Sequence, residues 1–151
     1  MPRISNSTEP SSTDIAYAAG VVDGEGCIHI AKTQLRGRQH PSYRLALSIT
    51  QNHRGLLERV ARTLRVPDRI YLVKRTTATN RDVYTLQISD QHAYGALQTM
   101  LPYLTRKGPE AQVGIEVYER GRMRVHPGPA GHPPDVWKIR EKAYRKLQRM
   151  K

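Results

Sequence analysis

Two carboxylates stand close together between glycines near the start of the chain, at Asp23 and Glu25 in the stretch AAGVVDGEG. The residues before them predict a helix over 14–23, which Gly24 and Gly26 would end. Acidic side chains are disfavoured at that end of a helix, because the helix dipole is negative there. A bound cation would offset the repulsion, and hard cations such as Mg²⁺ prefer carboxylate and carbonyl oxygens. These residues alone leave two interpretations open: a divalent metal site, or two acids in a glycine-rich turn.

Small residues form a stripe along the same predicted helix. Ala16, Gly20 and Gly24 are spaced four residues apart, so they lie on one helix face. Without larger side chains between them, a neighbouring backbone can approach this face closely. The sequence therefore predicts that the helix packs tightly against another element along this stripe.

Hydrophobic periodicity predicts the elements that must position these residues. Over residues 42–51, Tyr43, Leu45, Leu47 and Ile49 alternate with polar or small residues, which is typical of a half-buried antiparallel strand. Two such hairpins with helices on one face define an α+β domain. In chain order we expect a helix (14–23), a hairpin (27–35 and 42–51), a helix (54–65), a hairpin (69–76 and 82–89), two helices (90–101 and 109–120) and a last helix (135–150).

Composition indicates one domain with terminal extensions and a polyanionic partner. The 151 residues carry 25 Lys and Arg against 13 Asp and Glu, and ten of the basic residues follow residue 119. Such an excess favours nucleic acid, while the absence of a long apolar run or signal peptide argues against a membrane and against export. The single Cys27 excludes an internal disulfide. We divide the chain into a flexible arm (1–13), the domain (14–121), a Pro/Gly linker (122–134) and a basic helix (135–151).

The stretch from Ala18 to Gly26 resembles the LAGLIDADG motif of homing endonucleases. Ala19, Gly20, Asp23 and Gly26 are identical to the motif, and Val21, Val22 and Glu25 are conservative matches. The hairpin, helix, hairpin and helix that follow extend the resemblance over residues 14–120. It implies a LAGLIDADG homing endonuclease-like fold with a four-stranded saddle-shaped sheet. It also implies a single-motif, homodimeric enzyme that cuts double-stranded DNA at a long pseudo-palindromic site, as in intron homing.

The resemblance also implies roles for particular residues. Glu25 and the Gly24 carbonyl would bind Mg²⁺ (or Mn²⁺), whereas Ca²⁺ would bind without supporting cleavage, and no small-molecule cofactor is expected. Gln51 would organise active-site water, Lys107 or the adjacent Arg106 would lie near the scissile phosphate, and His53 or Arg54 could supply a further basic group. Asp23 would support the helix end. The two-fold packing of motif helices would use Ala16, Ala19 and Gly20.

The polar face of the predicted sheet would lie in the major groove of DNA. Each of these positions is equally compatible with an ordinary exposed sheet residue, and the set carries more weight than any single contact. The basic C-terminal helix either contacts phosphates or packs back on the domain. The expected DNA contacts are His29, Ala31, Thr33, Arg36, Arg38, Arg44, Ser48, Arg69, Tyr71, Arg75, Arg81, Thr85 and Gln87.

Two other functions fit the same fold. One is a DNA-binding regulator that does not cleave, although the presence of Glu25 favours a nuclease. The other is an RNA-splicing maturase, which the sequence does not separate from a nuclease. The expected location is the cytoplasm, at the nucleoid of a prokaryotic or phage host, or the matrix of an organelle.

Overall fold

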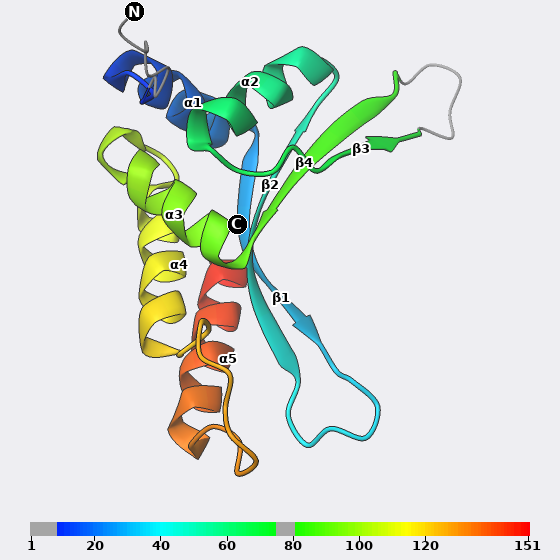
Figure 1. Cartoon of the computed structure of the whole chain (residues 1–151), viewed down its shortest axis with the longest axis vertical. Coiled ribbons are helices and arrows are strands. Elements are labelled where there is room, and N and C mark those ends of the chain that lie inside the picture. The colour runs from blue at the N-terminus through cyan, green and yellow to red at the C-terminus, as the bar shows by residue number, and fades with distance from the viewer. Residues whose placement is uncertain (1–8, 75–80) are drawn as a thin grey trace, which may run out of the picture.

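The structure is a computed structural model that describes residues 9–74 and 81–151. It confirms the predicted α+β class, with every expected helix and strand present in the expected order (Figure 1). The elements are α1 (Ser12–Glu25), β1 (Gly26–Thr33), β2 (Ser42–Gln51), α2 (Arg54–Leu64), β3 (Ile70–Val73), β4 (Val83–Ser89), α3 (Asp90–Met100), the short 3-10 helix η1 (Leu101–Tyr103), α4 (Gly108–Arg120) and α5 (Pro134–Arg149).

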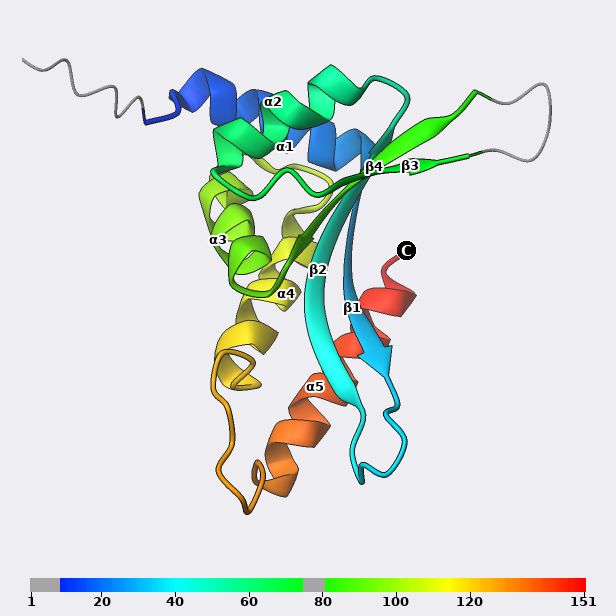
Figure 2. The same cartoon turned by 45° about the vertical axis from the view of Figure 1, so that its right-hand side comes forward.

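The four strands form one antiparallel sheet in the order β1-β2-β4-β3. The helices gather on one side of this sheet, as predicted, and the hairpins β1–β2 and β3–β4 diverge from its centre (Figure 2). In this way the sheet keeps one face free of helices. We call this the open face and the other the covered face.

Alternation along the strands decides which residues the helices cover. Leu45, Leu47 and Ile49 of β2 lie on the covered face and are fully buried. Arg44 alternates with them, lies on the open face and is exposed. The main core lies between the sheet and helices α1 to α4. A second, smaller core joins β1, α4 and α5, and it consists of Ile30, Val113, Val117, Ala143 and Leu147.

Helix α1 begins and ends differently from the prediction. It starts at Ser12, because Ser11 caps it by accepting from the backbone N–H of Asp14 at 3.1 Å, and Asp14 completes a capping box. It continues through Gly24 to Glu25, so Gly24 does not end it. Gly26 then starts β1 at once, and a Cβ there would lie only 2.7 Å from the Val22 carbonyl oxygen. Glycine is therefore required for this abrupt change from helix to strand.

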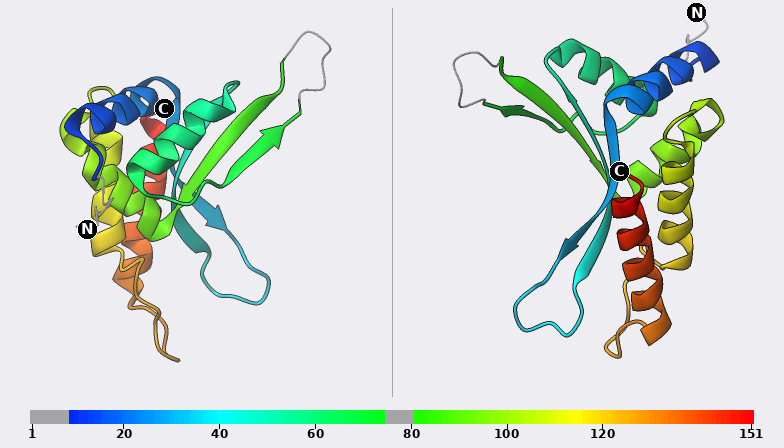
Figure 3. Two further views of the ribbon diagram at one scale, coloured as in Figure 1. Left: turned by 45° about the horizontal axis from the view of Figure 1, so that its top comes forward. Right: turned by 180° about the vertical axis from the view of Figure 1, so that it is seen from behind.

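Smaller differences concern the strand ends and the linked helix. The first strand ends at Thr33 rather than at 35, and β3 begins at Ile70. Most of the predicted N-terminal arm (1–8), the end of the predicted third strand and the expected contact Arg75 lie outside the described residues. Helix α5 packs back on β1 and α4 (Figure 3, right). Within the described ranges, no helix is both long and apolar enough to cross a membrane.

Candidate active site

Glu25 is the last residue of α1, and the next residue, Gly26, is the first residue of β1. Its side chain and the neighbouring Gly24 are exposed, and no basic residue occupies the last turn of α1. The negative end of the helix dipole and the carboxylate thus share one exposed corner. This corner presents a carboxylate and a main-chain carbonyl, a donor set that suits a hard divalent cation.

Asp23 fixes a distant loop to this corner. Its carboxylate accepts hydrogen bonds from the backbone N–H groups of Thr105 and Lys107, both at 2.8 Å. Lys107 is the residue that precedes α4, so the helix end that Asp23 holds is the start of α4. We expected Asp23 to support a helix end, and the end that its carboxylate contacts in the structure is the start of α4.

The side chain of Lys107 is held close to the protein rather than extended into solvent. Only 14% of it is exposed, and its Nζ lies 4.0 Å from Oε2 of Glu110, one turn along α4. Glu110 is itself buried, and Oε2 has no hydrogen-bond partner within the described residues. Sequence reasoning missed Glu110, although an acid three residues after Lys107 in a helix opened by Pro109 signals this pairing. The alternative basic residue, Arg106, is exposed.

Gln51 reaches the same corner from β2. The register pairs Gly26 with Ile49, so Gln51 ends β2 two residues beyond the position opposite Gly26, the residue that follows α1, and it pairs with Tyr84 of β4. It is half-buried, and its Oε1 accepts from the N–H of Asn52 at 2.8 Å. The structure thus places the backbone of Lys107 against Asp23 in the last turn of α1, next to Gly24 and Glu25, and places Gln51 at the end of the strand that pairs with β1.

The two other basic candidates have structural roles next to this corner. His53 caps α2, because its Nδ1 accepts from the N–H of Leu56 at 3.1 Å. The Arg54 guanidinium donates to Glu58 at 2.9 Å and lies 5.8 Å from the centre of the Tyr84 ring. Both side chains are thus already engaged within α2 and the sheet.

The expected dimer contacts divide between two sides of α1. Ala16 and Gly20 are exposed, and among the described residues a Cβ built on Gly20 or Gly24 meets nothing within 4 Å apart from its chain neighbours and the backbone of its own helix. Ala19 is fully buried in the main core. Neighbouring helix positions differ by about 100° in direction, so Ala19 cannot share the face of Gly20. Its side chain is therefore not available to a partner, and the exposed stripe consists of Ala16, Gly20 and Gly24.

The expected DNA contacts on the strands lie on the open face. The pairings Ala31 with Arg44, Ser48 with Gln87, and Tyr71 with Thr85 place residues of all four strands side by side. Near the start of α3 a hollow of about 360 Å³ includes Arg44, Arg69 and Gln87 in its lining. The expected loop contacts Arg36, Arg38 and Arg81 are exposed at the hairpin connections.

Among the titratable residues expected to contact DNA from the open face, His29 is the least exposed. Burial, and then the positive charge of Lys151, lower the pKa of His29 below its ordinary value of 6.5. Its Nδ1 is buried and lacks a hydrogen-bond partner in the part of the chain that the structure describes. Both effects disfavour the protonated form, so His29 is better suited to hydrogen bonding as a neutral ring than to pairing with a phosphate as a cation.

Comparisons with known proteins agree with this architecture. No protein-family model and no curated protein matches the sequence. Among solved structures, this fold is that of the LAGLIDADG homing endonucleases, which confirms the resemblance seen around Asp23 at the level of the fold. One similar structure is the homing endonuclease I-CvuI in complex with the I-CreI target, with a TM-score of 0.73, 18% identity, and coverage of 92% of this chain and 82% of that chain.

Two further structures show the same likeness. The archaeal intron-encoded homing endonuclease I-Vdi141I, complexed with DNA, has a TM-score of 0.72 at 17% identity over 92% of this chain and 84% of that chain. The LAGLIDADG homing endonuclease I-GzeII, in complex with its DNA target, has a TM-score of 0.61 at 13% identity, and the match covers 90% of this chain but 43% of that chain. The match thus covers more than four-fifths of the first two structures and less than half of the third.

Proposed function

We propose that this protein is a site-specific, metal-dependent homing endonuclease that cuts double-stranded DNA as a homodimer at a long pseudo-palindromic site. The observation that carries the proposal is the exposed Glu25 carboxylate at the end of α1, where the chain enters the sheet, on a fold shared with endonucleases complexed with DNA. The excess of 25 basic over 13 acidic residues supports a polyanionic substrate.

Glu25 and the carbonyl of Gly24 would hold the divalent cation. One carboxylate per chain does not readily hold the two metal ions that can act on the attacking and leaving oxygens, and the described residues contain no group of three or more His, Cys, Asp or Glu that could hold a metal. A second copy would add its own carboxylate at the same place. When bound, Mg²⁺ or Mn²⁺ would supply activated water and neutralise charge on the phosphate oxygens, whereas we expect Ca²⁺ to bind without cleavage.

The exposed stripe of α1 supports the dimer. Ala16, Gly20 and Gly24 present no side chain larger than a methyl group, so a second copy of α1 could approach backbone to backbone. Such packing would bring the two Glu25 corners together, because Glu25 directly follows the stripe. The chain's own core does not cover this stripe, which distinguishes it from the buried face that contains Ala18, Ala19 and Val22.

Three further side chains would act around the reacting phosphate. The amide of Gln51 would orient water, and the Lys107 ammonium would stabilise negative charge on the phosphate. Asp23 would act as a positioning residue, since it holds the backbone of Lys107 through a 2.8 Å hydrogen bond. The open-face side chains and the exposed arginines of the hairpin connections would contact bases and phosphates of the duplex.

Metal-dependent cleavage of a randomised palindromic DNA library tests the proposal, with EDTA as the control for the metal. We expect discrete cuts at one class of long sequence with Mg²⁺ and none with EDTA. Glu25→Gln should abolish cutting and keep DNA binding within a few-fold, while the matched variant Glu116→Gln, at an exposed acid of α4, should cut normally. Sequence-selective binding without cutting by the unmodified protein would instead identify a DNA-binding regulator, and selective binding of RNA would favour a maturase.

A further inference from the structure

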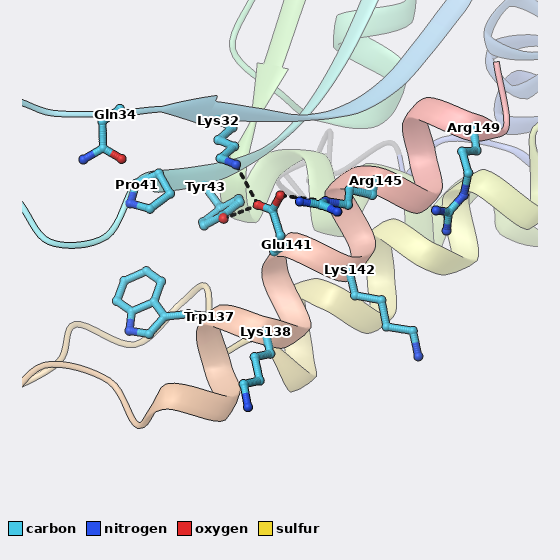
Figure 4. A pocket seen from close by; sticks show the side chains of 10 residues that line it. All are labelled: Lys32, Gln34, Pro41, Tyr43, Trp137, Lys138, Glu141, Lys142, Arg145 and Arg149. Carbon is cyan, nitrogen blue, oxygen red and sulfur yellow. Dashed lines mark hydrogen bonds and ion pairs between the residues drawn. The ribbon is translucent and has the colours of Figure 1, made fainter.

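A basic groove lies on the covered face, between the β1–β2 hairpin and α5 (Figure 4). Its volume is about 620 Å³. Four cations of α5, at Lys138, Lys142, Arg145 and Arg149, line it and recur at intervals of four, three and four residues. This spacing places them in one row along the helix, over a length of about 16 Å. We call this row the α5 stripe.

The base of the groove is fixed by a single carboxylate. Glu141 accepts from Lys32 Nζ at 2.8 Å, from the Tyr43 hydroxyl and from Arg145 Nε at 3.0 Å. Hydrogen bonds from Lys32 and Tyr43 lower the pKa of Glu141 to about 2, so it is fully ionised at neutral pH. These bonds tie α5 to both strands of the hairpin and thereby keep the groove preformed.

The charge of the groove remains strongly positive after this pairing. Five cations line it against one carboxylate, and Glu141 is shared by Lys32 and Arg145. Within residues 9–74 and 81–151, Lys138, Lys142 and Arg149 have no acidic group within ion-pair distance, 4.0 Å. In Figure 4 the Lys138 and Lys142 side chains point away from the hairpin toward solvent. A polyanion would therefore meet cations that no protein carboxylate neutralises.

The aromatic residues of the groove are already engaged within the chain. The Trp137 ring stacks on His40 with ring centres 4.5 Å apart, and the Arg140 guanidinium lies 4.9 Å from the centre of the same indole. Trp137 thus joins the hairpin to α5, and its ring already has two partners within the chain. Recognition here would depend on charge, which means that the ligand's backbone rather than its base sequence would be bound.

The groove is separate from the proposed DNA site. Lys32 and Tyr43 pair across β1 and β2 on the covered face, opposite the face that carries Arg44 and Ser48. A duplex on the open face would have the sheet between it and the α5 stripe. The stripe is also a single row, whereas a duplex presents two phosphate rows across a groove about 12 Å wide. A single row of cations matches a single phosphodiester backbone.

From these observations we propose that the α5 stripe binds the backbone of a single-stranded nucleic acid, independently of sequence and of duplex bound at the open face. The site goes beyond the proposed nuclease activity and does not require it. RNA and single-stranded DNA share the phosphodiester backbone, and a direct comparison of their binding shows which of the two the α5 stripe takes.

Fluorescence anisotropy with labelled oligo(U) RNA, oligo(dT) DNA and a blunt duplex of scrambled sequence tests this site in the full chain. The variant is Lys138→Gln, Lys142→Gln and Arg149→Gln together. The matched control removes the same charge elsewhere through Arg62→Gln, Arg120→Gln and Lys146→Gln, which are exposed positions. Unfolding curves of both triple variants establish that each is folded.

For four backbone contacts, the slope of log affinity against log salt should be about −3 for the unmodified protein and about −1 for the stripe variant. At low salt the stripe variant should bind single strands at least tenfold more weakly than the control variant, with unchanged duplex binding and unchanged cleavage of the DNA library. Preference for oligo(U) would identify RNA, and equal binding would identify a site that accepts both. Equal binding of single strands by the two triple variants, or a loss of duplex binding as large as that of single strands, would overturn the proposal.

Discussion

Replacing Asp23 by Asn tests whether one carboxylate fixes the loop before α4. Asp23 lies at the negative end of α1 and at the positive end of α4, so the two helix dipoles act on its charge with opposite signs and largely cancel. The two 2.8 Å hydrogen bonds to Thr105 and Lys107 then determine the outcome. Charge-assisted bonds contribute about 1.5–3 kcal/mol each. Water can replace the bond to the exposed Thr105, and Asn keeps one acceptor, so we expect a loss of about 2 kcal/mol.

Urea unfolding measures this loss as a free energy, with Asp68→Asn as the matched control. Asp68 is exposed in a loop, and its substitution should change stability by less than about 0.5 kcal/mol. Asp23→Asn should also lower the cleavage rate more than it weakens DNA binding, because the displaced loop carries Lys107. If Asp23→Asn matched Asp68→Asn in stability, the two hydrogen bonds would not hold this loop. If the cleavage rate were also unchanged, Asp23 would not position Lys107.

Three further substitutions test other parts of the structure. Glu141→Gln should destabilise the protein at pH 7 by about 1–2 kcal/mol after allowance for solvent screening. Because the pKa of Glu141 is lowered from 4.5 to about 2, the stability difference between the two proteins should be complete above pH 4.5 and should vanish as the pH falls to 2. Urea unfolding at several pH values would measure it. Gly20→Leu should leave the fold of one chain intact, since among the described residues nothing outside its own helix lies within 4 Å of a Cβ built there, but it should abolish the proposed dimer in analytical ultracentrifugation; a dimer that persisted would move the interface elsewhere. Gly26→Ala should destabilise the fold by about 1–3 kcal/mol, measured by thermal unfolding, because its Cβ would clash with the Val22 carbonyl; an unchanged Tm would contradict the required sharp turn.

Local patterns were sufficient to predict the elements and the corner at Glu25. The alternation of Leu45, Leu47 and Ile49 with Arg44 and Ser48 indicates both that β2 is a strand and which side is covered, although the small Ala46 is buried as well. The glycine-flanked acids likewise mark the end of α1, although Gly24 proved compatible with helix. In these cases the physical cause lies within a few residues of the effect, so the sequence contains it.

Contacts between distant residues could not be read from spacing. The partners of Asp23 lie 82 and 84 residues away, and nothing near Asp23 indicates them. The burial of Ala19 depends on which side of α1 the sheet covers. The positive charge of the C-terminal helix was evident, but its position on the covered face depends on Glu141, whose bond to Tyr43 spans 98 residues.

A newly made chain contains the β1–β2 hairpin well before it contains α5, because Tyr43 and Glu141 are 98 residues apart. At about 5–20 residues per second, a ribosome takes roughly 5–20 s to make the 98 residues between Tyr43 and Glu141. During this time β1 is an edge strand with an unshielded side, since Ile30 is buried chiefly by residues of α4 and α5. The apolar side of β1 around Ile30 can then associate with apolar surface of another unfinished chain. Docking of α5 is the step that buries this side, and loss of α5 would leave it exposed.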